Sequence, residues 1–318
     1  MTQTLDLKDR KILAELEMNA RISHSELARK LKTSKQVIKY RIENLEKQKL
    51  IQGYNALIDI TQLGETIYVI YLKIMQMSSK KEKEWVAQIS QNPNVLAVGK
   101  NAGHWDLTIA IRSKNNQELD FVLKKLTTGK SDNIKEKLIT SEIESSYFNT
   151  AILHKTKEEE CSTSDSQKNI EIDEKDRKLI HYLSENCRTS LLDLSEKLRM
   201  SPNGVKNRIE SLESQKIIIG YKTKINYEKL GYLHFRVFLH LSKFTTEIYN
   251  KIKSFLKLKG NVESVSRYLG YADIDFRCYS KDIAELYDLI SEVKDNFLQN
   301  IVEVDSIPIF GWEKIEYY

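Results

Sequence analysis

The chain has 318 residues, a formal net charge of +5 at pH 7 and 41% hydrophobic residues. This length suits two ordinary domains or four small ones, and the composition excludes a chain that is disordered or fibrous throughout. No stretch approaches the roughly 20 apolar residues of a membrane span, and the start lacks the apolar core of a signal peptide, so we expect a cytoplasmic protein. The three cysteines are far apart, which argues against a disulfide framework or a zinc site, and we expect no metal or cofactor.

The chain contains an internal repeat. The segment from Leu5 to Leu16 (LDLKDRKILAEL) is matched 167 positions later by the segment from Ile172 to Leu183 (IDEKDRKLIHYL). This offset holds without a gap to Tyr54 and Tyr221, with about half of the positions identical, so two copies of a two-part module fill the chain. We expect domains at residues 1–60, 64–154, 171–227 and 230–318. Residues 155–170 are polar and predict a flexible linker that need not keep the copies in contact.

The first part of each copy has the pattern of a helix-turn-helix. In the first copy, Asp6 can cap a helix whose apolar residues recur at helical spacing from Ile12 to Leu16. A second short helix from Ser25 to Leu31 is followed by a break, and Ser34 then caps a longer third helix. The extended segment from Leu50 to Tyr54 could form a wing. We therefore expect a winged helix-turn-helix domain in each copy.

The third helix of each copy is the candidate DNA-binding element. Its buried face is expected to hold Val37, Ile38, Ile42 and Leu45, which leaves a polar face that donates hydrogen bonds. A major groove accepts a helix and offers acceptors to Lys and Gln, while phosphates pair with Lys and Arg, so we expect double-stranded DNA as the partner. A solvated helix face is the alternative. The candidate residues are Ser34, Lys35, Gln36, Lys39, Tyr40 and Arg41, and in the second copy Asn203, Lys206, Asn207 and Arg208.

Two points about these residues follow from the sequence. Because the second copy has different side chains on this face, the two heads should prefer different base sequences. Arg41 and Arg208 lie beside the buried stripe, and they could brace acidic residues such as Glu46 and Glu213 as readily as contact phosphates.

The second part of each copy predicts the order βαββαβ. In the first copy we expect strands at 66–75, 95–100, 107–112 and 137–147, and helices at 80–91 and 116–126; in the second, strands at 235–241, 262–267, 274–279 and 301–310, and helices at 246–256 and 283–293. This order is ferredoxin-like, with helices on one face of an antiparallel sheet. The predicted fold class is thus α+β, with two winged helix-turn-helix and two ferredoxin-like domains in tandem.

The other face of each sheet needs a cover. Alternation places the even-numbered residues from Tyr68 to Ile74 against the helices and the apolar odd-numbered residues from Ile67 to Tyr71 on the far face. The same face of the second copy carries Arg236, Asp275 and Arg277. Packing one copy on the other would set these arginines against apolar residues, unless Asp275 neutralises them within its own sheet. We therefore expect like-with-like pairing in a homodimer of tandem chains rather than a self-contained pseudo-dimer.

These segments resemble the Lrp/AsnC transcription regulators. The resemblance is carried by Asp6 to Leu13, Arg21, Ser34 to Glu46, Ile51 to Tyr54 and Leu63-Gly64, and it recurs in the second copy. It implies a sequence-specific DNA-binding regulator whose ferredoxin-like domain mediates dimerisation and can bind an amino-acid effector. The tandem arrangement is a departure from the family, whose members usually carry one module per chain.

A Gly-x-x-Asp loop before the third strand resembles the family's effector loop. Its residues are Gly103, His104, Trp105 and Asp106, and in the second copy Gly270, Tyr271 and Asp273. A structural role is the alternative, because glycine adopts positive φ and aspartate can bond to nearby backbone. His104 and Trp105 could equally be packing residues. Ala272 and Tyr271 replace them in the second copy, so any ligand there should differ.

An enzyme and an architectural DNA-binding protein are the two alternative functions. The sequence lacks the common catalytic motifs, and we expect no enzyme. Sirohaem decarboxylases resemble Lrp/AsnC proteins but carry a His-Asn-Tyr-x-Arg run where this chain has Val98 to Asn101 (VGKN) and Ser266 to Leu269 (SRYL). An architectural protein that binds DNA with little sequence preference stays open, although a net charge of +5 is modest for electrostatic coating.

Overall fold

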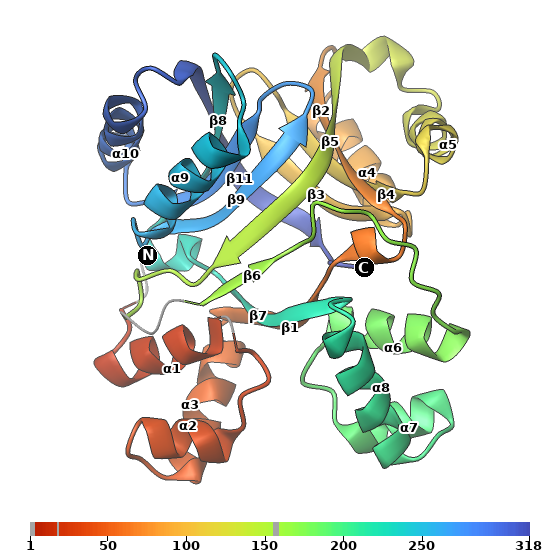
Figure 1. The fold of residues 1–318 in the computed structure, drawn as a ribbon, viewed down its shortest axis with the longest axis vertical. Coiled ribbons are helices and arrows are strands. Elements are labelled where there is room, and N and C mark those ends of the chain that lie inside the picture. Colours follow the sequence, from red (N-terminus) through yellow and green to blue (C-terminus); the bar gives the residue numbers. More distant parts are fainter. Residues whose placement is uncertain (1–3, 18, 155–158) are drawn as a thin grey trace.

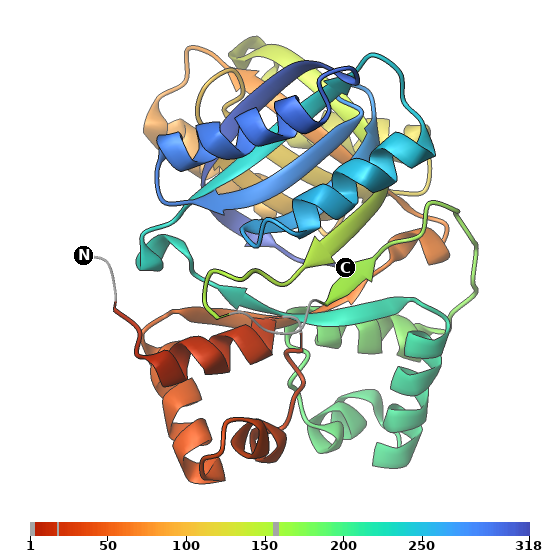
Figure 2. The same ribbon diagram turned by 60° about the vertical axis from the view of Figure 1, so that its left-hand side comes forward.

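The structure, a computed structural model, describes residues 4–17, 19–154 and 159–318. Two small helical heads lie side by side on one side of a large sheet layer (Figures 1 and 2). The first head contains α1 (Leu7–Glu17), α2 (His24–Lys30) and α3 (Lys35–Lys47), and the second contains α6 (Glu174–Glu185), α7 (Leu191–Leu198) and α8 (Pro202–Ser214). No helix within these ranges is long and apolar enough to cross a membrane.

The helices of the heads begin where the sequence predicts caps. The side chain of Asp6 accepts a hydrogen bond from the Asp9 backbone N–H at 2.8 Å, and Ser34 accepts one from Val37 at 3.2 Å. Ile38, Ile42 and Leu45 are buried, as expected. Val37 is 36% exposed, so the prediction that it lies in the core is wrong. Ile38, Ile42 and Leu45 recur at helical spacing and form the buried face of α3. Val37, one residue before Ile38, lies at the edge of this face.

The segment predicted to form a wing joins the two heads instead. It belongs to β1 (Ile51–Ile58), which pairs antiparallel with β7 (Ile218–Ile225) of the second copy in a separate two-stranded sheet. A wing would pair with a strand of its own head. Because β1 and β7 are equivalent strands of the repeat, each supplies the partner that the other lacks. We call this pair the ribbon.

The ribbon holds each head against the strand of the other copy. The Tyr54 carbonyl accepts a hydrogen bond from Cys187 N–H at 2.7 Å, and the Tyr221 carbonyl accepts one from Ala20 N–H at 3.0 Å. Arg188 lies over the Tyr54 ring and Arg21 over the Tyr221 ring, at 5.0 and 5.2 Å from the centroids. The apolar core of both heads is accordingly one cluster. The two heads therefore form a single unit.

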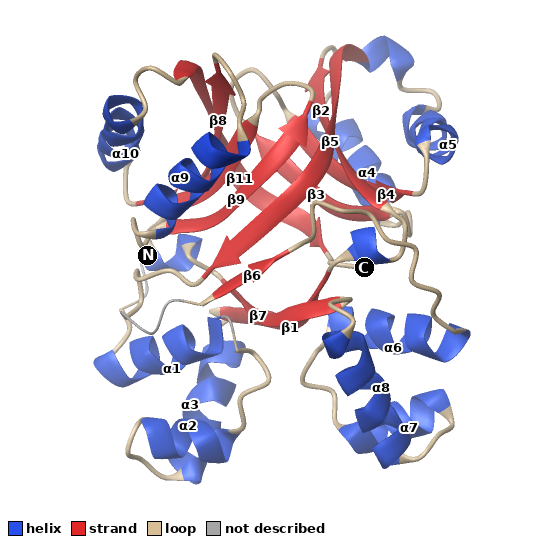
Figure 3. Cartoon of the chain, in the orientation of Figure 1, coloured by secondary structure: helices blue, strands red, loops and turns tan. Residues whose placement is uncertain are grey.

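The sheet layer consists of two equivalent halves (Figure 3). The first half contains β2 (Thr66–Ile74), α4 (Ser79–Ser90), β3 (Val95–Asn101), β4 (Leu107–Ser113), α5 (Asn116–Thr127) and β5 (Ile134–Phe148). The second half contains β8 (Leu233–Leu241), α9 (Thr246–Lys257), β9 (Val262–Leu269), β10 (Ile274–Ser280), α10 (Ile283–Asn296) and β11 (Ile301–Ile315). Short 3-10 turns cover Ile60–Gln62, Ser131–Asn133 and Glu228–Leu230. The predicted βαββαβ order is confirmed in both halves.

The two halves close into one barrel. Each half has the ferredoxin-like order, β5-β2-β4-β3 and β11-β8-β10-β9, and the halves join where β3 pairs with β11 and β9 pairs with β5. The long strands β5 and β11 each pair first with their own half and then with the other. Gly99 of β3 is required at one junction, because a Cβ atom there would lie 2.9 Å from the ring of Trp312.

The expectation that the two copies avoid each other is wrong. The helix-facing residues of β2 pack on α4 and α5 as predicted. Its far-face residues Val69 and Tyr71 form a cluster with Phe238, Tyr268 and Ile307 of the second half. The chain is therefore a self-contained pseudo-dimer, and the face that the sequence assigned to a second chain is covered from within.

The buried arginines are accommodated by partners that strand alternation did not reveal. Nη1 of Arg236 donates to the Tyr71 hydroxyl at 2.6 Å, and its Nε lies 3.5 Å from a carboxylate oxygen of Asp275. Nε of Arg277 donates to the Ser264 hydroxyl at 2.8 Å. These arginines thus lie beside polar or oppositely charged side chains, which reduces the penalty that argued against intrachain packing, although neither carboxylate oxygen of Asp275 has a hydrogen bond among the described residues.

The linker between the copies is not flexible over its described part. Residues Glu160–Ser162 form β6, which pairs with the end of β5. Farther along, Ser164 N–H donates to the Asp59 carboxylate at 2.8 Å, and Ile170 N–H donates to the Gln62 carbonyl at 2.8 Å. Residues 155–158 lie outside the described residues. From 159 onward the connection is therefore fixed against the first copy.

Candidate DNA-binding face and effector loops

The predicted DNA-binding side chains lie on the exposed faces of two equivalent helices. Lys35, Gln36, Lys39 and Tyr40 of α3 are exposed, and so are Asn203, Lys206 and Asn207 of α8. Ser34 and Ser201 cap these helices through hydrogen bonds to the backbone of Val37 and Gly204. Both helices begin at the end of a head that points away from the barrel (Figure 2). A duplex could therefore meet both heads without contacting the barrel.

The lysines on these faces form only weak, exposed ion pairs in the described structure. Nζ of Lys39 lies 3.8 Å from Glu43, and Nζ of Lys206 lies 3.6 Å from Glu210, both as exposed pairs one helical turn apart. Such pairs contribute little and are easily exchanged for a phosphate. Tyr40 of the first head is 65% exposed and corresponds to Asn207 in the second. The two faces share a lysine and differ around it.

Arg41 and Arg208 are bound within their own heads. Nη1 of Arg41 donates to carboxylate oxygens of Asp6 and Asp9 at 2.7 and 2.8 Å. Arg208 makes the equivalent pairs with Asp173 and Asp176 at 2.8 and 2.7 Å. The structure thus favours the bracing role for both arginines. The braced residues are these aspartates, whereas Glu46 and Glu213, the partners suggested by the sequence, accept hydrogen bonds from the hydroxyls of Tyr54 and Tyr221.

Asp6 and Asp173 are also helix caps, and the pKa of each carboxyl group reflects both the cap and the ion pair. The Asp9 backbone N–H and then the Arg41 guanidinium lower the pKa of Asp6. The pKa of Asp173 is lowered by the backbone N–H of Asp176 and by Arg208. Each cap therefore stays ionised and ties the first helix of its head to the third, which fixes the orientation of the exposed face.

The Gly-x-x-Asp loops have an internal structural role in both halves. Gly103 and Gly270 have φ values of +96° and +129°, which favour glycine. The Asp106 carboxylate accepts hydrogen bonds from Ile74 N–H at 2.7 Å and from Lys73 Nζ at 3.2 Å. In the second half, the carboxylate of Asp273 accepts a hydrogen bond from Leu241 N–H at 2.8 Å. Both aspartates thus secure the ends of β2 and β8.

The aromatic residues of the loops meet between the two halves. Trp105 is 6% exposed, and its ring lies 6.0 Å from that of Tyr71 and 6.5 Å from that of Tyr271. The Tyr271 hydroxyl donates to Asp305 at 2.6 Å. His104 points outward, with Nε2 3.1 Å from Glu136. Trp105 and Tyr271 are therefore interface residues, while His104 lies at an exposed rim.

Comparison with known proteins agrees with the geometry of the heads. The model of the AsnC-type helix-turn-helix domain matches residues 5–46 and 172–213, which include α1–α3 and α6–α8 except for the last residue of α3 and of α8. An uncharacterized HTH-type transcriptional regulator of Pyrococcus furiosus is 31% identical over 132 residues, which span 41% of this chain and 84% of that protein. The chain belongs to the Lrp/AsnC family of helix-turn-helix transcriptional regulators.

Other comparisons add detail to this assignment. The proline dehydrogenase transcriptional activator of Rhodobacter capsulatus is 35% identical over 120 residues, or 37% of this chain and 77% of that protein. Each of these regulators corresponds to about one copy of the repeat. The crystal structure of the sirohaem decarboxylase NirDL covers 97% of this chain and 92% of its own, with a TM-score of 0.63 and 12% identity. That likeness shows a shared tandem fold and nothing about chemistry.

The sequence did not reveal every residue of interest. Lys222 and Glu263 form a buried ion pair with a distance of 3.3 Å between the ribbon and the barrel. Their equivalents in the first copy are Asn55 and Leu96, so a comparison of the two copies would have singled out this pair.

Proposed function

We propose that one chain of this regulator binds an operator composed of two half-sites with different sequences. The observation that carries the proposal is the ribbon, which joins two unlike heads into one unit on one side of the barrel (Figure 2). Two heads fixed in this way require a fixed half-site spacing, for which about one helical turn of DNA is the usual value. Lys35, Gln36, Lys39 and Tyr40 contact one half-site, and Asn203, Lys206 and Asn207 contact the other.

Selection of bound sequences from a random duplex library tests this proposal. At about 150 mM salt, non-specific affinity is weak, so an enriched sequence reports base recognition. We expect two different motifs at constant spacing. A palindrome would contradict the unlike heads, and retention of DNA without enrichment would favour the architectural alternative. Loss of one motif upon substitution of Asn203 and Asn207 by alanine, with the other retained, would assign the motifs to heads.

We also propose that an amino acid modulates DNA binding at the first Gly-x-x-Asp loop. In support, a cavity of about 320 Å³ lies beside this loop and is lined by Asp106, Met75, Lys100, Glu82 and Phe310 among others. Lys100, which pairs with Glu82 at 3.1 Å, and the Asp106 carboxylate, which is bonded to Lys73, border this cavity, and an amino acid would pair with them by exchanging these exposed contacts. Calorimetry across the common amino acids should give heat for at least one. The absence of heat for all of them would contradict the proposal.

Association of whole chains is a separate proposal, because the far faces of the sheets are covered within one chain. It is supported by large exposed apolar side chains in the second half, namely Ile283, Tyr287, Leu298, Val302 and Phe310. Such residues favour contacts between copies. Light scattering should then give a multiple of 37.1 kDa, and the monomer mass at micromolar concentration would contradict association.

We propose finally that the protein is not a catalyst. The relatives that support the family assignment are regulators, and the decarboxylase shares only the fold. Neither of the second strands, β3 (VLAVGKN) and β9 (VESVSRYL), contains the His-Asn-Tyr-x-Arg run of the decarboxylases. Incubation with a tetrapyrrole should leave its absorbance spectrum unchanged, and a shifted spectrum would reopen the enzyme hypothesis.

A further inference from the structure

A cavity of about 270 Å³ lies between the ribbon and the second half of the barrel. The ribbon side of its wall is formed by β7, which contributes Lys222 and Lys224, and the barrel side by β8, β9 and β10. The barrel side contributes His234, Glu263, Arg277 and Tyr279. The cavity is smaller than a typical drug pocket, and its size suits a metabolite of a few heavy atoms.

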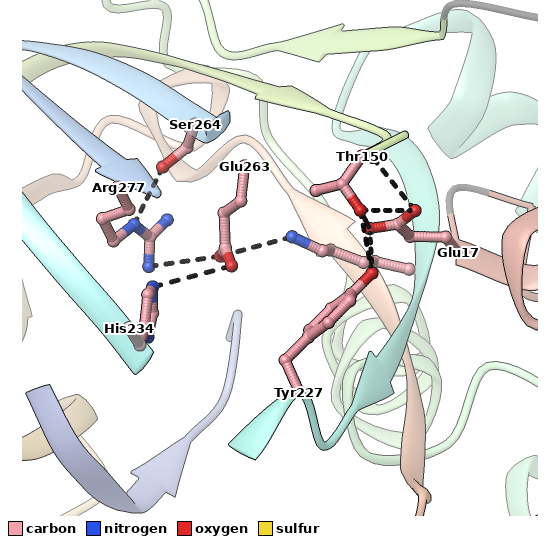
Figure 4. A network of polar contacts seen from close by, with 8 residues as sticks. Glu17, Thr150, Tyr227, His234, Glu263, Ser264 and Arg277 are labelled. Atoms are coloured by element: carbon pink, nitrogen blue, oxygen red, sulfur yellow. Dashed lines mark hydrogen bonds and ion pairs between the residues drawn. The ribbon is translucent and has the colours of Figure 1, made fainter. Parts of the chain in front are cut away.

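The buried wall of this cavity carries more positive than negative charge. Glu263 is the carboxylate at the centre, with Lys222 at 3.3 Å, His234 at 3.7 Å and Arg277 at 3.9 Å (Figure 4). Burial opposes its ionisation, but Lys222 and Arg277 hold the pKa of Glu263 well below its ordinary value. One carboxylate therefore serves two permanent cations.

Lys224 adds a further cation without a partner. Among the described residues, its side chain has no hydrogen bond or ion pair, and burial lowers its pKa. His234 is buried, its pKa is lowered by burial to about 4, and its Nε2 atom has no hydrogen bond in the described parts of the chain. Lys224 and Arg277 thus border the same cavity with spare capacity to pair with an anion.

The remaining carboxylates of the wall do not cancel this surplus. Glu17 accepts hydrogen bonds from Thr150 N–H, the Thr150 hydroxyl and the Tyr227 hydroxyl, at 3.0, 3.1 and 2.7 Å (Figure 4). Burial raises the pKa of Glu17 to about 7, so it is only partly ionised at neutral pH. Glu228 is exposed to solvent at the rim, where its charge is screened.

The first copy of the repeat shows that the fold does not need these charges. At the positions equivalent to Lys224, His234, Glu263 and Arg277 it has Leu57, Ile67, Leu96 and Ala110. Three of these residues, Ile67, Leu96 and Ala110, line a smaller space of about 80 Å³. Both halves nevertheless form the same strands with the same pairing. Because buried charges are costly unless they have a function or a partner, their concentration in one copy points to a ligand.

We propose that this cavity binds a small organic anion with one or two carboxylate groups, held between Lys224 of the ribbon and Arg277 of the barrel. The inference goes beyond the proposed operator and concerns a site separate from the Gly-x-x-Asp loops. Since the wall spans the ribbon and the barrel, occupancy would tie the heads more firmly to the barrel. The ligand would then act on DNA affinity through the placement of the heads.

Calorimetry of the full chain with succinate and acetate, without DNA, tests the site. The ionic strength is matched with NaCl so that screening stays constant. We expect saturable binding of at least one probe with one site per chain. Lys224→Met should weaken binding at least tenfold, which corresponds to the loss of one charge-assisted contact. Lys251→Met, which removes an exposed lysine of α9 whose pair among the described residues is Glu247, is the matched control and should bind as the parent does.

A second variant gives four positions of the second copy the residues that the first copy has there. Lys222→Asn, His234→Ile, Glu263→Leu and Arg277→Ala together replace Glu263 and the three basic residues around it, so that no member of this ion-paired group is left buried alone, and they keep Lys224 in place. Circular dichroism checks that this variant folds, and we expect it to lose saturable binding. If it does not fold, Lys224→Met decides.

Two results would overturn the proposal. The first is the absence of saturable binding of either probe to the parent up to about 50 mM, which is far weaker than metabolite recognition. The second is binding by Lys224→Met equal to that of the parent. Because these measurements contain no DNA, failure of the operator proposal would leave them interpretable.

Discussion

The two halves of the barrel have the same fold, but at two equivalent positions on their facing sides the residues are uncharged in the first half and charged in the second. Where the first half has Val69 and Thr108, the second has Arg236 and Asp275 at the equivalent positions. The halves nevertheless pack on each other, because Tyr71 of the apolar half accepts a hydrogen bond from Arg236 while Asp275 supplies the opposite charge. After duplication, one half has become the complement of the other. Like-with-like pairing is thus unnecessary once both partners lie in one chain.

Breaking the charge pair on one side alone should have the largest effect. Arg236→Val removes the larger of the two positive influences on the buried Asp275 and leaves only that of Arg277, and we expect the free energy of unfolding to fall by about 3–5 kcal/mol. The double variant Arg236→Val, Asp275→Thr has the residues of the first half at both positions. It should recover most of the loss, apart from about 1 kcal/mol for the hydrogen bond to Tyr71. Urea unfolding measures both, and a double variant no more stable than the single one would show that the pair is not coupled.

Substitutions of Trp105 and His104, which are neighbours in the first Gly-x-x-Asp loop, should differ sharply in their effect on the free energy of unfolding. Trp105→Ala removes a buried ring from the interface between the halves and should cost about 3–4 kcal/mol. His104→Ala changes a side chain that is 60% exposed, and stability should stay within about 0.5 kcal/mol. Thermal and urea unfolding of the two variants in parallel tests this contrast. Equal destabilisation by both would mean that the loop acts as a whole and that Trp105 has no special part in joining the halves.

Glu17 gives one head a dependence on pH that its counterpart Ser184 cannot give. Burial raises the pKa of Glu17 from 4.5 to about 7, so between these values the folded state holds a proton that the unfolded state has lost. Its contribution to stability is therefore full below pH 4.5 and falls as the pH rises to about 7, by about 3 kcal/mol in all.

Glu17→Gln should remove this dependence. The amide stays neutral, and its oxygen can still accept hydrogen bonds from Tyr227 and Thr150. The stability of the variant relative to the parent should therefore increase as the pH rises from 4.5 to 8. His234, whose pKa is lowered to about 4, has the opposite effect, since its contribution is present above pH 6.5 and is lost as the pH falls. This contribution of His234 is present in both the parent and the variant, so it cancels in the difference between their stabilities. A constant difference in urea midpoint across this range would contradict the assignment.

Local pattern predicted the elements of this fold and their inner faces. Helical spacing identified α3 through Ile38 and Ile42, and alternation identified the two faces of β2. The caps Asp6 and Ser34 were visible because their side chains bond to backbone within three residues. Of the candidate site, the exposure of Lys35, Gln36, Lys39 and Tyr40 followed from the same spacing.

The arrangement of the elements was not predictable from local pattern. The strand β1 has the same sequence character whether it forms a wing or pairs with β7, because hydrogen-bonding partners distant in the chain leave no local mark. Closure of the barrel depended on Tyr71 serving as an acceptor for Arg236, which an alternation pattern classifies only as apolar. The polar composition of the linker predicted flexibility, but composition does not show which backbone N–H groups find acceptors. The N–H groups of Ser164 and Ile170 are both bonded to the first copy.

The smallest expected effects separate contact with DNA from bracing within a head. The pair that Lys39 makes in the described part of the chain is an exposed one with Glu43, so Lys39→Ala should leave stability unchanged. If Lys39 meets a phosphate, this variant should also reduce the slope of log affinity against log salt by roughly one unit. Arg41→Ala breaks the pairs with Asp6 and Asp9. It should destabilise the first head by about 1 kcal/mol, because these pairs are partly exposed, with little change in the slope.

The second head provides the matched test of this distinction. Lys206 and Arg208 occupy the equivalent positions, and Arg208 pairs with Asp173 and Asp176 in the same geometry. Lys206→Ala should therefore lower the salt slope as Lys39→Ala does, and Arg208→Ala should lower stability instead. Fluorescence anisotropy from about 50 to 200 mM salt measures the slope over the range in which counterion release dominates. If the arginine variants change the slope and the lysine variants do not, the phosphates are bound by the braced residues, and the exposed lysines play no part in affinity.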